Sequence, residues 1–267
     1  MGYGGDLFWT VLAKEIYKKH KKKVVFMKNG KIIYSIMWIK NPNISEVKNN
    51  DTFTIDFTNY NFEEEIKKNN HYSKQRCNHY KIDPIDLIPV LNYTEEEENK
   101  IRNILKNLPK RFICIEPIAK TTWTKNKLFP FHKWQKVVDE LKSKNIEVVQ
   151  VGLLNDKKLN NVIDVRSELN SIRETGCLIK YCDLFVSTEG GLTNISAANN
   201  NRCLSIVSPM FVPSLIEPNT ENYKCIWIHS DSHKGCRKIN KCEECKKLMN
   251  NFDESIIIKK ILKILNI

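Results

Sequence analysis

The chain contains three short segments whose residue types can hold an anion. The first is residues 2–6, Gly-Tyr-Gly-Gly-Asp, directly before a predicted helix. Glycines let backbone amides approach a ligand closely, and the N-terminus of a helix favours a negative charge. Asp6 can alternatively be read as the N-cap of that helix. The segment lacks the GxGxxG spacing and the Lys-Ser/Thr pair of a P-loop, which argues against a dinucleotide or NTPase site.

The second segment, residues 116–130, follows a predicted strand and precedes a predicted helix. It combines three hydroxyl side chains with three lysines: Thr121, Thr122, Thr124, Lys120, Lys125 and Lys127. Hydroxyl and ammonium groups at a helix entrance suit a diphosphate, whose charge they neutralise most strongly as it departs. The alternative interpretation is a solvated basic loop.

The third segment, residues 187–194, is Ser-Thr-Glu-Gly-Gly-Leu-Thr-Asn and again joins a strand to a helix. Gly190 and Gly191 remove side-chain bulk where helix amides point outward, so a phosphate or sugar can lie against them. Glu189 can accept hydrogen bonds from sugar hydroxyls. The structural alternative is a helix cap beside a tight turn.

Cysteines near the C-terminus suggest a different chemistry. Cys225, Cys236, Cys242 and Cys245 lie close together in sequence, and residues 242–245 have the CxxC spacing that lets two thiolates share one metal. His229 and His233 lie among them. The pattern suggests a structural zinc site, with unmetallated cysteines as the alternative. The other cysteines lie in or beside apolar runs and are expected in the core.

Composition and charge narrow the class of protein. The 267 residues are 41% hydrophobic and 28% charged, and no apolar run approaches the length of a membrane span. We therefore expect a soluble, cytoplasmic protein. Lys and Arg outnumber Asp and Glu by 43 to 31, a net charge of +12, which favours polyanionic partners. The lysine cluster, defined as residues 14–23, fits a solvated helix end, a contact with anionic lipid or a nucleic-acid groove.

Apolar runs in the second half alternate between strand and helix patterns. We predict strands at 111–116, 146–152, 162–165, 184–187 and 203–207, with helices at 131–144, 156–161, 171–181 and 190–199. This βαβ spacing predicts a parallel sheet with helices on both faces. It also places the second and third segments at the carboxyl ends of strands, where α/β sheets bind ligands.

The first half has the same character but is less regular. We predict a helix over about 6–19, strands at 24–27 and 52–57, a helix from about 63, and another from a capping box at 94–97 to about 108. Residues 108–111 resemble a linker, which divides the chain into lobes 1–108 and 109–267. A final amphipathic helix from Asp253 belongs to the second lobe or packs back on the first.

The order of these features resembles glycosyltransferase family 9, the heptosyltransferase-like enzymes of the two-lobed GT-B fold. Four features carry the resemblance. The first is Gly5-Asp6 at the start of the first helix. The second is the run from Lys127 to Pro130, Lys-Leu-Phe-Pro, which is similar to the family's Lys-x-Trp-Pro and has Trp134 downstream. Residues 149–152 are followed by Asp156. Residues 187–197 stand in the place of Asp-Ser/Thr-Gly-x-x-His-x-x-Ala.

The resemblance implies two Rossmann-like lobes with parallel sheets and inverting transfer from a nucleotide diphosphate sugar, with no metal or cofactor required. The expected partners are an ADP-sugar donor and a glycan or lipid-linked acceptor of lipopolysaccharide biosynthesis. Nucleic acid is not expected as a partner. The lysine cluster would then face an anionic inner membrane surface. The N-terminal lobe would be acceptor-side and the C-terminal lobe would bind the nucleotide sugar.

The resemblance also implies roles for individual residues. Asp6 would be the catalytic base that takes the acceptor proton. The nucleotide-sugar site would contain Gly4, Gly5, Thr121, Thr122, Lys127, Asp156, Glu189, Gly190, Gly191, Leu192, Thr193 and Asn194.

The chain departs from the family pattern at several positions. Glu189, Gly190 and Asn194 replace the family's Asp, Ser/Thr and His, which admits a nucleotide sugar other than ADP-heptose. The first lobe is short and lacks the strand that should precede Gly2. These departures motivate one alternative, a GT-B-like protein that binds nucleotide or glycan without catalysis. The net charge of +12 and the lysine cluster motivate another, a basic nucleic-acid-binding protein. No nucleic-acid-binding signature supports the latter.

Overall fold

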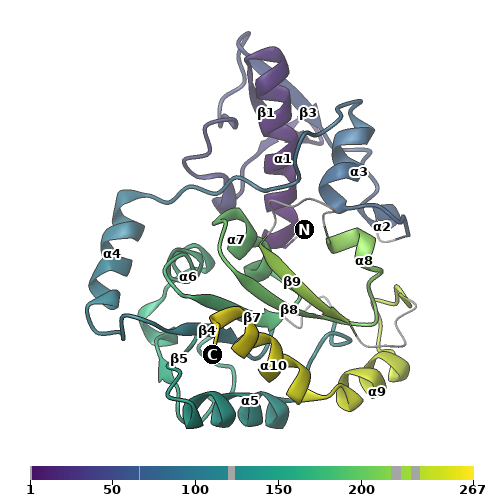
Figure 1. Ribbon diagram of the computed structural model, residues 1–267. Coiled ribbons are helices and arrows are strands. Elements are labelled where there is room, and N and C mark those ends of the chain that lie inside the picture. The colour runs from purple at the N-terminus through teal and green to yellow at the C-terminus, as the bar shows by residue number, and fades with distance from the viewer. Residues whose placement is uncertain (1, 66, 120–123, 218–223, 230–234) are drawn as a thin grey trace. The chain divides into compact units, whose positions relative to one another are not determined.

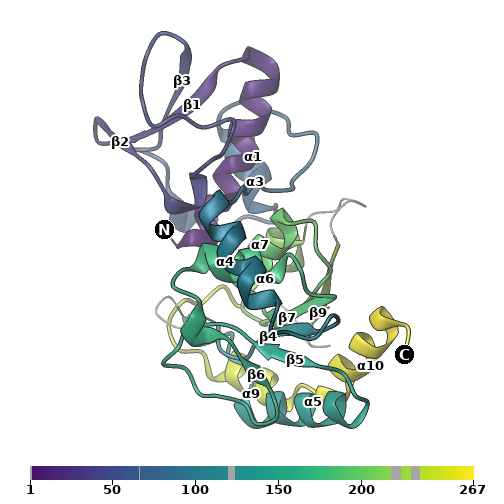
Figure 2. The same cartoon turned by 90° about the vertical axis from the view of Figure 1, so that its left-hand side faces the viewer.

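The computed structural model describes residues 2–65, 67–119, 124–217, 224–229 and 235–267. Contacts between Cα atoms divide the chain into two compact units. Unit 1 is Met1–Thr94 with Pro213–Tyr223, and unit 2 is Glu95–Val212 with Lys224–Ile267. Figures 1 and 2 together label the helices and strands of both units, which are described separately below.

Unit 2 is built on a six-stranded sheet in which every pair of neighbours is parallel. In spatial order its strands are β6 (Ile163–Asp164), β5 (Val148–Gln150), β4 (Ile113–Glu116), β7 (Leu184–Thr188), β8 (Cys203–Val207) and β9 (Cys225–His229). The chain runs outward from β4 in one direction and from β7 in the other. The boundary between β4 and β7 is thus the topological switch point, where open α/β sheets bind ligands.

Helices cover both faces of this sheet. Figure 2 shows α5 (Phe131–Ser143), α9 (Glu243–Asn251) and α10 (Glu254–Leu265) on one face, and α4 (Glu95–Leu105), α6 (Ile172–Ile179) and α7 (Gly191–Ala198) on the other. The helix predicted at 131–144 is confirmed as α5, and its apolar residues Trp134, Val137, Val138 and Leu141 are buried in a core that includes Ile113, Ile115 and Val186. A short 3-10 helix, Arg166–Glu168, follows β6.

Unit 1 contains a smaller, mixed sheet in the order β2-β1-β3. Strand β1 (Lys23–Lys28) pairs parallel with β3 (Thr52–Asp56) and antiparallel with β2 (Lys31–Ile33). The remaining elements are α1 (Tyr3–His20), a 3-10 helix (Ile36–Trp38), α2 (Phe62–Glu65), α3 (Tyr72–His79) and α8 (Pro213–Ile216). Trp9 of α1 is fully buried, and its ring stacks on Phe57 with a centroid distance of 5.2 Å.

The predicted α/β class with a parallel sheet and helices on both faces is confirmed, but two local predictions are wrong. Residues 156–161 form no helix. The Gln150 side chain bonds the Lys157 carbonyl and the Leu159 amide, and Arg166 bonds the carbonyls of Leu153 and Asp156. These side chains satisfy backbone groups that a helix would otherwise pair.

The second correction concerns the start of α1. The helix begins at Tyr3 with Gly2 as its N-cap residue, so Gly4, Gly5 and Asp6 form its first turn and not a preceding loop. The N-cap interpretation of Asp6 is therefore wrong.

Several elements were not predicted, namely β2, α3, α8, β9, α9 and the two 3-10 helices. At the C-terminus, α10 begins after Asp253 as predicted and packs on α5 within unit 2. The assignment of residues 1–108 and 109–267 to acceptor and donor sides concerns binding roles and stays a prediction. Across the part of the chain that the structure describes, helices of sufficient length and apolarity to traverse a bilayer are absent.

Candidate functional site

Three charged side chains meet at the switch point of unit 2. Glu116 is the last residue of β4, Glu189 follows β7, and Lys127 lies in the loop before α5. The Lys127 ammonium lies 3.7 Å from Glu189 Oε2. Lys127, Glu116 and Glu189 are only 7%, 8% and 8% exposed. We call these three residues the switch-point cluster.

Glycine backbone forms part of the surroundings of this cluster. A Cβ added at Gly190, the N-cap residue of α7, would lie 4.0 Å from Lys127 Nζ and 3.6 Å from Ala119 Cβ. Gly152, after β5, has a φ of +118°, which side-chain-bearing residues rarely adopt, and a Cβ there would lie 3.6 Å from Glu116 Cγ. The absence of side chains thus leaves the N-terminus of α7 close to the Lys127 ammonium.

The electrostatics of the cluster are unbalanced, because two carboxyl groups face one ammonium. Burial raises the pKa of Glu116 to about 8; Lys127 opposes this shift, while Asp156 and Glu189 add to it. Oε2 of Glu116 and Oε2 of Glu189 are buried with no hydrogen-bond partner among the described residues. Buried carboxyl oxygens ordinarily have partners, so these two can accept hydrogen bonds from a ligand.

The remaining residues predicted around α7 divide into two groups. Thr193 and Leu192 are buried, and the Thr193 hydroxyl lies 3.1 Å from Ser187 Oγ, which assigns it to internal packing. Gly191 is the first residue of α7. Asn194 is buried, and its backbone N–H donates a hydrogen bond to the Gly190 carbonyl. Thr121 and Thr122 lie outside the described residues, as does Lys120.

Asp156 lies in the loop after β5, half-buried near the switch-point cluster. Burial raises its pKa above the ordinary value, while its backbone contact with Leu153 and the charge of Arg166 lower it. Arg166 donates a hydrogen bond of 2.7 Å to the Asp156 carbonyl and pairs with Asp164. The loop that carries Asp156 is therefore held by charged side chains.

Asn126 was missed by the sequence reasoning, although it precedes Lys127. Its Nδ2 donates to the carbonyls of Lys238 and Asn240, each at 2.7 Å, and its Oδ1 accepts from the Cys242 amide at 2.9 Å. Nothing in the sequence signals these bonds, because the partners lie more than a hundred positions away. The Lys127 loop is thereby tied to the cysteine-bearing segment.

The predicted base lies in unit 1. Asp6 Oδ2 accepts a 2.7 Å hydrogen bond from the Ser35 hydroxyl, and Trp38 Nε1 donates to the Asp6 carbonyl at 2.9 Å. Burial raises the pKa of Asp6, against the lowering effects of the Ser35 hydrogen bond and the Arg76 charge. A carboxylate with a raised pKa is a stronger base than an ordinary aspartate.

A buried ion pair supports the turn that carries Asp6. Arg76 is 2% exposed and makes two hydrogen bonds to Glu65, of 2.7 and 2.9 Å. Arg76 also donates to the Gly5 carbonyl, and its guanidinium lies 4.6 Å from the centre of the Trp9 ring. Gly4 and Gly5 thus belong to a packed helix turn, and the Gly5 amide already donates to the Gly2 carbonyl.

The structure brings three of the four predicted cysteines together. The sulfurs of Cys236, Cys242 and Cys245 all lie within 4.8 Å of one another. Cys242 is the N-cap residue of α9, and hydrogen bonds from Cys245 and its neighbours lower its pKa. Cys225 lies on β9 opposite Cys203. His233 lies outside the described residues. Three thiols at this spacing fit a metal that prefers sulfur ligands.

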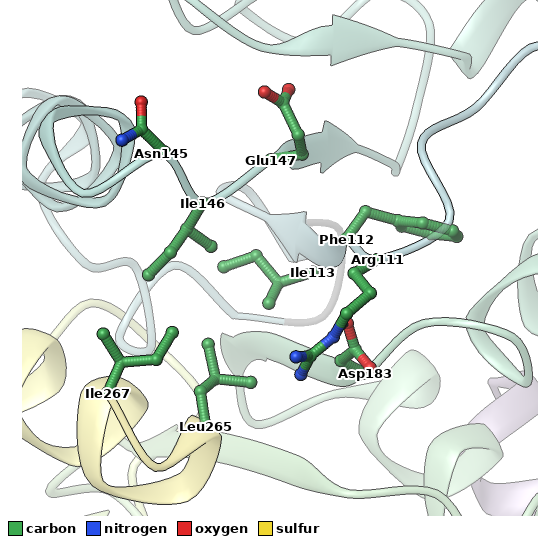
Figure 3. A pocket seen from close by; sticks show the side chains of 9 residues that line it. All are labelled: Arg111, Phe112, Ile113, Asn145, Ile146, Glu147, Asp183, Leu265 and Ile267. Carbon is green, nitrogen blue, oxygen red and sulfur yellow. Dashed lines mark hydrogen bonds and ion pairs between the residues drawn. The ribbon is translucent and has the colours of Figure 1, made fainter.

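A hollow of about 140 Å³ lies at the opposite end of the unit 2 sheet. Figure 3 shows the side chains around it, including Arg111 beside Asp183 and the C-terminal residues Leu265 and Ile267. It is lined by Ile113, the first residue of β4, and by residues that directly precede β4, β5 and β7. It contains none of the predicted site residues.

Comparisons with known proteins agree with this geometry. Residues 67–247, more than half of the chain, match the sequence profile of glycosyltransferase family 9 (heptosyltransferase). No curated protein sequence matches significantly. A family 9 glycosyltransferase from Veillonella parvula DSM 2008 has a similar structure, with 13% identity, a TM-score of 0.75 and coverage of 99% of this chain and 94% of that chain.

Two other solved structures are similar at the level of fold. The ADP-heptose LPS heptosyltransferase II of E. coli has 13% identity and a TM-score of 0.62, covering 99% of this chain and 96% of that chain. The iron-containing dodecameric glycosyltransferase TibC from enterotoxigenic E. coli H10407 has 15% identity and a TM-score of 0.64. The match covers 99% of this chain and 74% of the TibC chain. Another TibC structure is in complex with ADP-D-β-D-heptose. The chain therefore belongs to glycosyltransferase family 9 (heptosyltransferase) and is a glycosyltransferase with the GT-B fold.

Proposed function

We propose that the protein transfers a heptose or similar sugar from an ADP-linked donor to a glycan or lipid-linked acceptor. The buried Lys127, beside Gly190 at the N-terminus of α7, is the observation that carries the proposal. A diphosphate placed there would meet an ammonium and the positive end of a helix dipole. The similar structures whose titles name ADP-heptose support the choice of nucleotide.

In the proposed reaction Asp6 acts as the base. The acceptor oxygen attacks the anomeric carbon as the bond from that carbon to the diphosphate breaks, and the acceptor proton passes to the Asp6 carboxylate. Lys127 and the amides of α7 would stabilise the departing diphosphate, where negative charge develops. The carboxyl oxygens of Glu116 and Glu189 would accept hydrogen bonds from donor hydroxyls. No metal is required for these steps.

Two lysines in one loop provide a direct test. Lys127 is buried, whereas Lys125, two positions earlier, is exposed. We expect ADP to raise the Tm of the wild type and of Lys125→Ala, since a ligand that binds only the folded state stabilises it. In Lys127→Ala the shift should vanish and heptosyl transfer from ADP-heptose should stop, with circular dichroism unchanged. Equal shifts in both variants would contradict the proposed donor site.

We further propose that Cys236, Cys242 and Cys245 hold a structural metal ion, zinc or iron. The mutual spacing of the three sulfurs supports this, and TibC is described as iron-containing. Sulfur-rich sites favour these metals. Elemental analysis of the purified protein should find about one metal per chain, reduced in Cys242→Ser and unchanged in Cys177→Ser. Retention of the metal by Cys242→Ser would exclude the site.

Finally, we propose that the lysine cluster contacts an anionic membrane surface. Lys19, Lys21, Lys22 and Lys23 are exposed at the end of α1 and the start of β1. Each lysine near such a surface contributes about 1 kcal/mol. The protein should sediment with vesicles containing phosphatidylglycerol and not with pure phosphatidylcholine. Replacement of Lys19, Lys21 and Lys22 by Glu should abolish the preference for phosphatidylglycerol. Equal sedimentation of the wild type with both lipids would contradict the proposed membrane contact.

A further inference from the structure

The side-chain amide of Asn126 forms hydrogen bonds with a single segment that is distant in sequence. It is 4% exposed, and both of its polar side-chain atoms bond backbone groups between residues 238 and 242. Two carbonyls accept from Nδ2 and one amide donates to Oδ1. A side chain with donors and an acceptor in one plane is required for this set, and among the carboxamides Asn is the shorter. The fit makes Asn126 specific for the conformation of residues 238–242.

The two ends of this connection are the two proposed sites. Lys127 follows Asn126 directly in the chain, and Cys242, whose amide Asn126 holds, is one of the clustered cysteines. Asn126 is further anchored by the Ser208 hydroxyl, which donates to its carbonyl at 2.8 Å. Any displacement of the Cys242 backbone must therefore be accommodated by the residue next to Lys127.

Metal ligation would change the geometry of the cysteine cluster. Thiolates bound tetrahedrally at about 2.3 Å from a zinc ion are separated by about 3.8 Å. The three sulfurs now lie within 4.8 Å of one another, and those of Cys236 and Cys245 are 3.1 Å apart. Ligation would thus change the sulfur spacings and fix the conformation of residues 236–245, including the carbonyls that Asn126 bonds.

We propose that Asn126 is a positioning residue that couples metal binding at the cysteine cluster to donor binding at Lys127. The inference rests on the proposed donor and metal sites. A metal that fixes residues 238–242 fixes Asn126 and the start of the Lys127 loop, so the donor no longer has to order them. Coupling between two sites is reciprocal, so the donor must strengthen metal binding by the same factor.

The experiment compares ADP affinity in metal-free and cobalt-loaded protein. The protein is stripped with a chelator, reloaded with one equivalent of Co²⁺ and desalted, because free Co²⁺ would bind ADP. The thiolate-to-cobalt charge-transfer band reports loading, and calorimetry gives the Kd of ADP. Wild type should bind ADP about fivefold or more tightly when loaded, the lower end of typical coupling.

Variants separate coupling from folding. Asn126→Ala should keep the cobalt band but show the same Kd for ADP with and without cobalt. Asn126→Asp, which cannot donate to the two carbonyls, should also lose coupling and serves if the alanine variant is unstable. Asn103→Ala, at an exposed position on α4, should couple like the wild type.

Each failure has a separate meaning. Cobalt loading and ADP binding that occur independently in the wild type would overturn the inference and leave both proposed sites standing. An absent charge-transfer band with normal ADP binding would refute the metal site and the coupling together, but not the donor site. Cobalt loading without ADP binding would refute the proposed donor and, with it, the coupling.

Discussion

Asp6 in unit 1 is half-buried and Glu116 in unit 2 is buried, and burial raises the pKa of both carboxyl groups, yet their surroundings differ. Asp6 has a hydroxyl partner in Ser35, and the helix turn around it is held by Trp38 and Arg76. Oε2 of Glu116 and of its neighbour Glu189 have no hydrogen-bond partner among the described residues. The fold therefore supplies a hydrogen-bond partner to the Asp6 carboxyl, but leaves one oxygen each of Glu116 and Glu189 able to accept a further hydrogen bond.

The number of carboxyl groups per cation differs in the same sense. In unit 1 the buried Arg76 is matched by Glu65 in a two-bond pair. In the switch-point cluster one lysine faces two carboxyl groups. A carboxyl group that the fold itself supplies with a hydrogen bond is suited to be held in a fixed orientation, whereas carboxyl oxygens without a partner are suited to bind a ligand.

The strongest test of this contrast is removal of the Asp6 charge. Asp6→Asn retains an acceptor for Ser35 and should leave the Tm unchanged, while turnover falls by about 10²- to 10⁴-fold because the general base is lost. Ser35→Ala keeps the carboxylate, so turnover should fall far less in this variant. Steady-state kinetics with ADP-heptose measures both. Comparable turnover in Asp6→Asn would remove Asp6 from the base role.

The second test breaks the balanced pair in unit 1. Arg76→Leu would leave Glu65 buried without its cation, so we expect unfolding in urea to show a loss of about 3–5 kcal/mol. Lys67→Ala removes the exposed partner of Glu64 and should have no measurable effect. A mild effect of Arg76→Leu would mean that the pair does not hold unit 1 together.

The third test uses pH. Glu116 has an ordinary pKa of 4.5 and about 8 in the folded protein, so between these values the folded state binds the extra proton. Stability should therefore fall as pH rises through this window, by about 1.4 kcal/mol per pH unit, and level off above pH 8. Glu116→Gln should lose this slope in urea titrations at successive pH values. An identical slope in the variant would show that Glu116 is ionised throughout.

The smallest effect is expected at Gly190. A Cβ there meets Ala119 and Lys127 at ordinary contact distances, and the backbone is extended, so Gly190→Ala should fold with an unchanged Tm. The added methyl group would lie between the N-terminus of α7 and the Lys127 ammonium. We expect a roughly threefold to tenfold weaker Kd for ADP, a loss of up to about 1.4 kcal/mol. Unchanged affinity would locate the diphosphate elsewhere.

Much of unit 2 could be predicted because its signals are local. The buried strand 113–116, the apolar stripe of α5 and the Gly190-Gly191 helix start each follow from residues close in sequence. The helix expected at 156–161 was wrong because its backbone groups are satisfied by Gln150 and Arg166, which no local pattern reveals. The start of α1 was missed because glycines are poor indicators of helix.

The sequence by itself determined the alternation of strands and helices, the basic character of the chain and the residue types available for a diphosphate. Only the tertiary structure decided which of those residues share a site. Arg76 bonds Gly5 and Asn126 bonds Cys242, each from a separate part of the chain. Lys127 pairs with Glu189, and both of their charges act on Glu116. The physical reason is that periodicity is a local property of the chain, whereas burial, charge balance and hydrogen-bond satisfaction depend on groups brought together by folding.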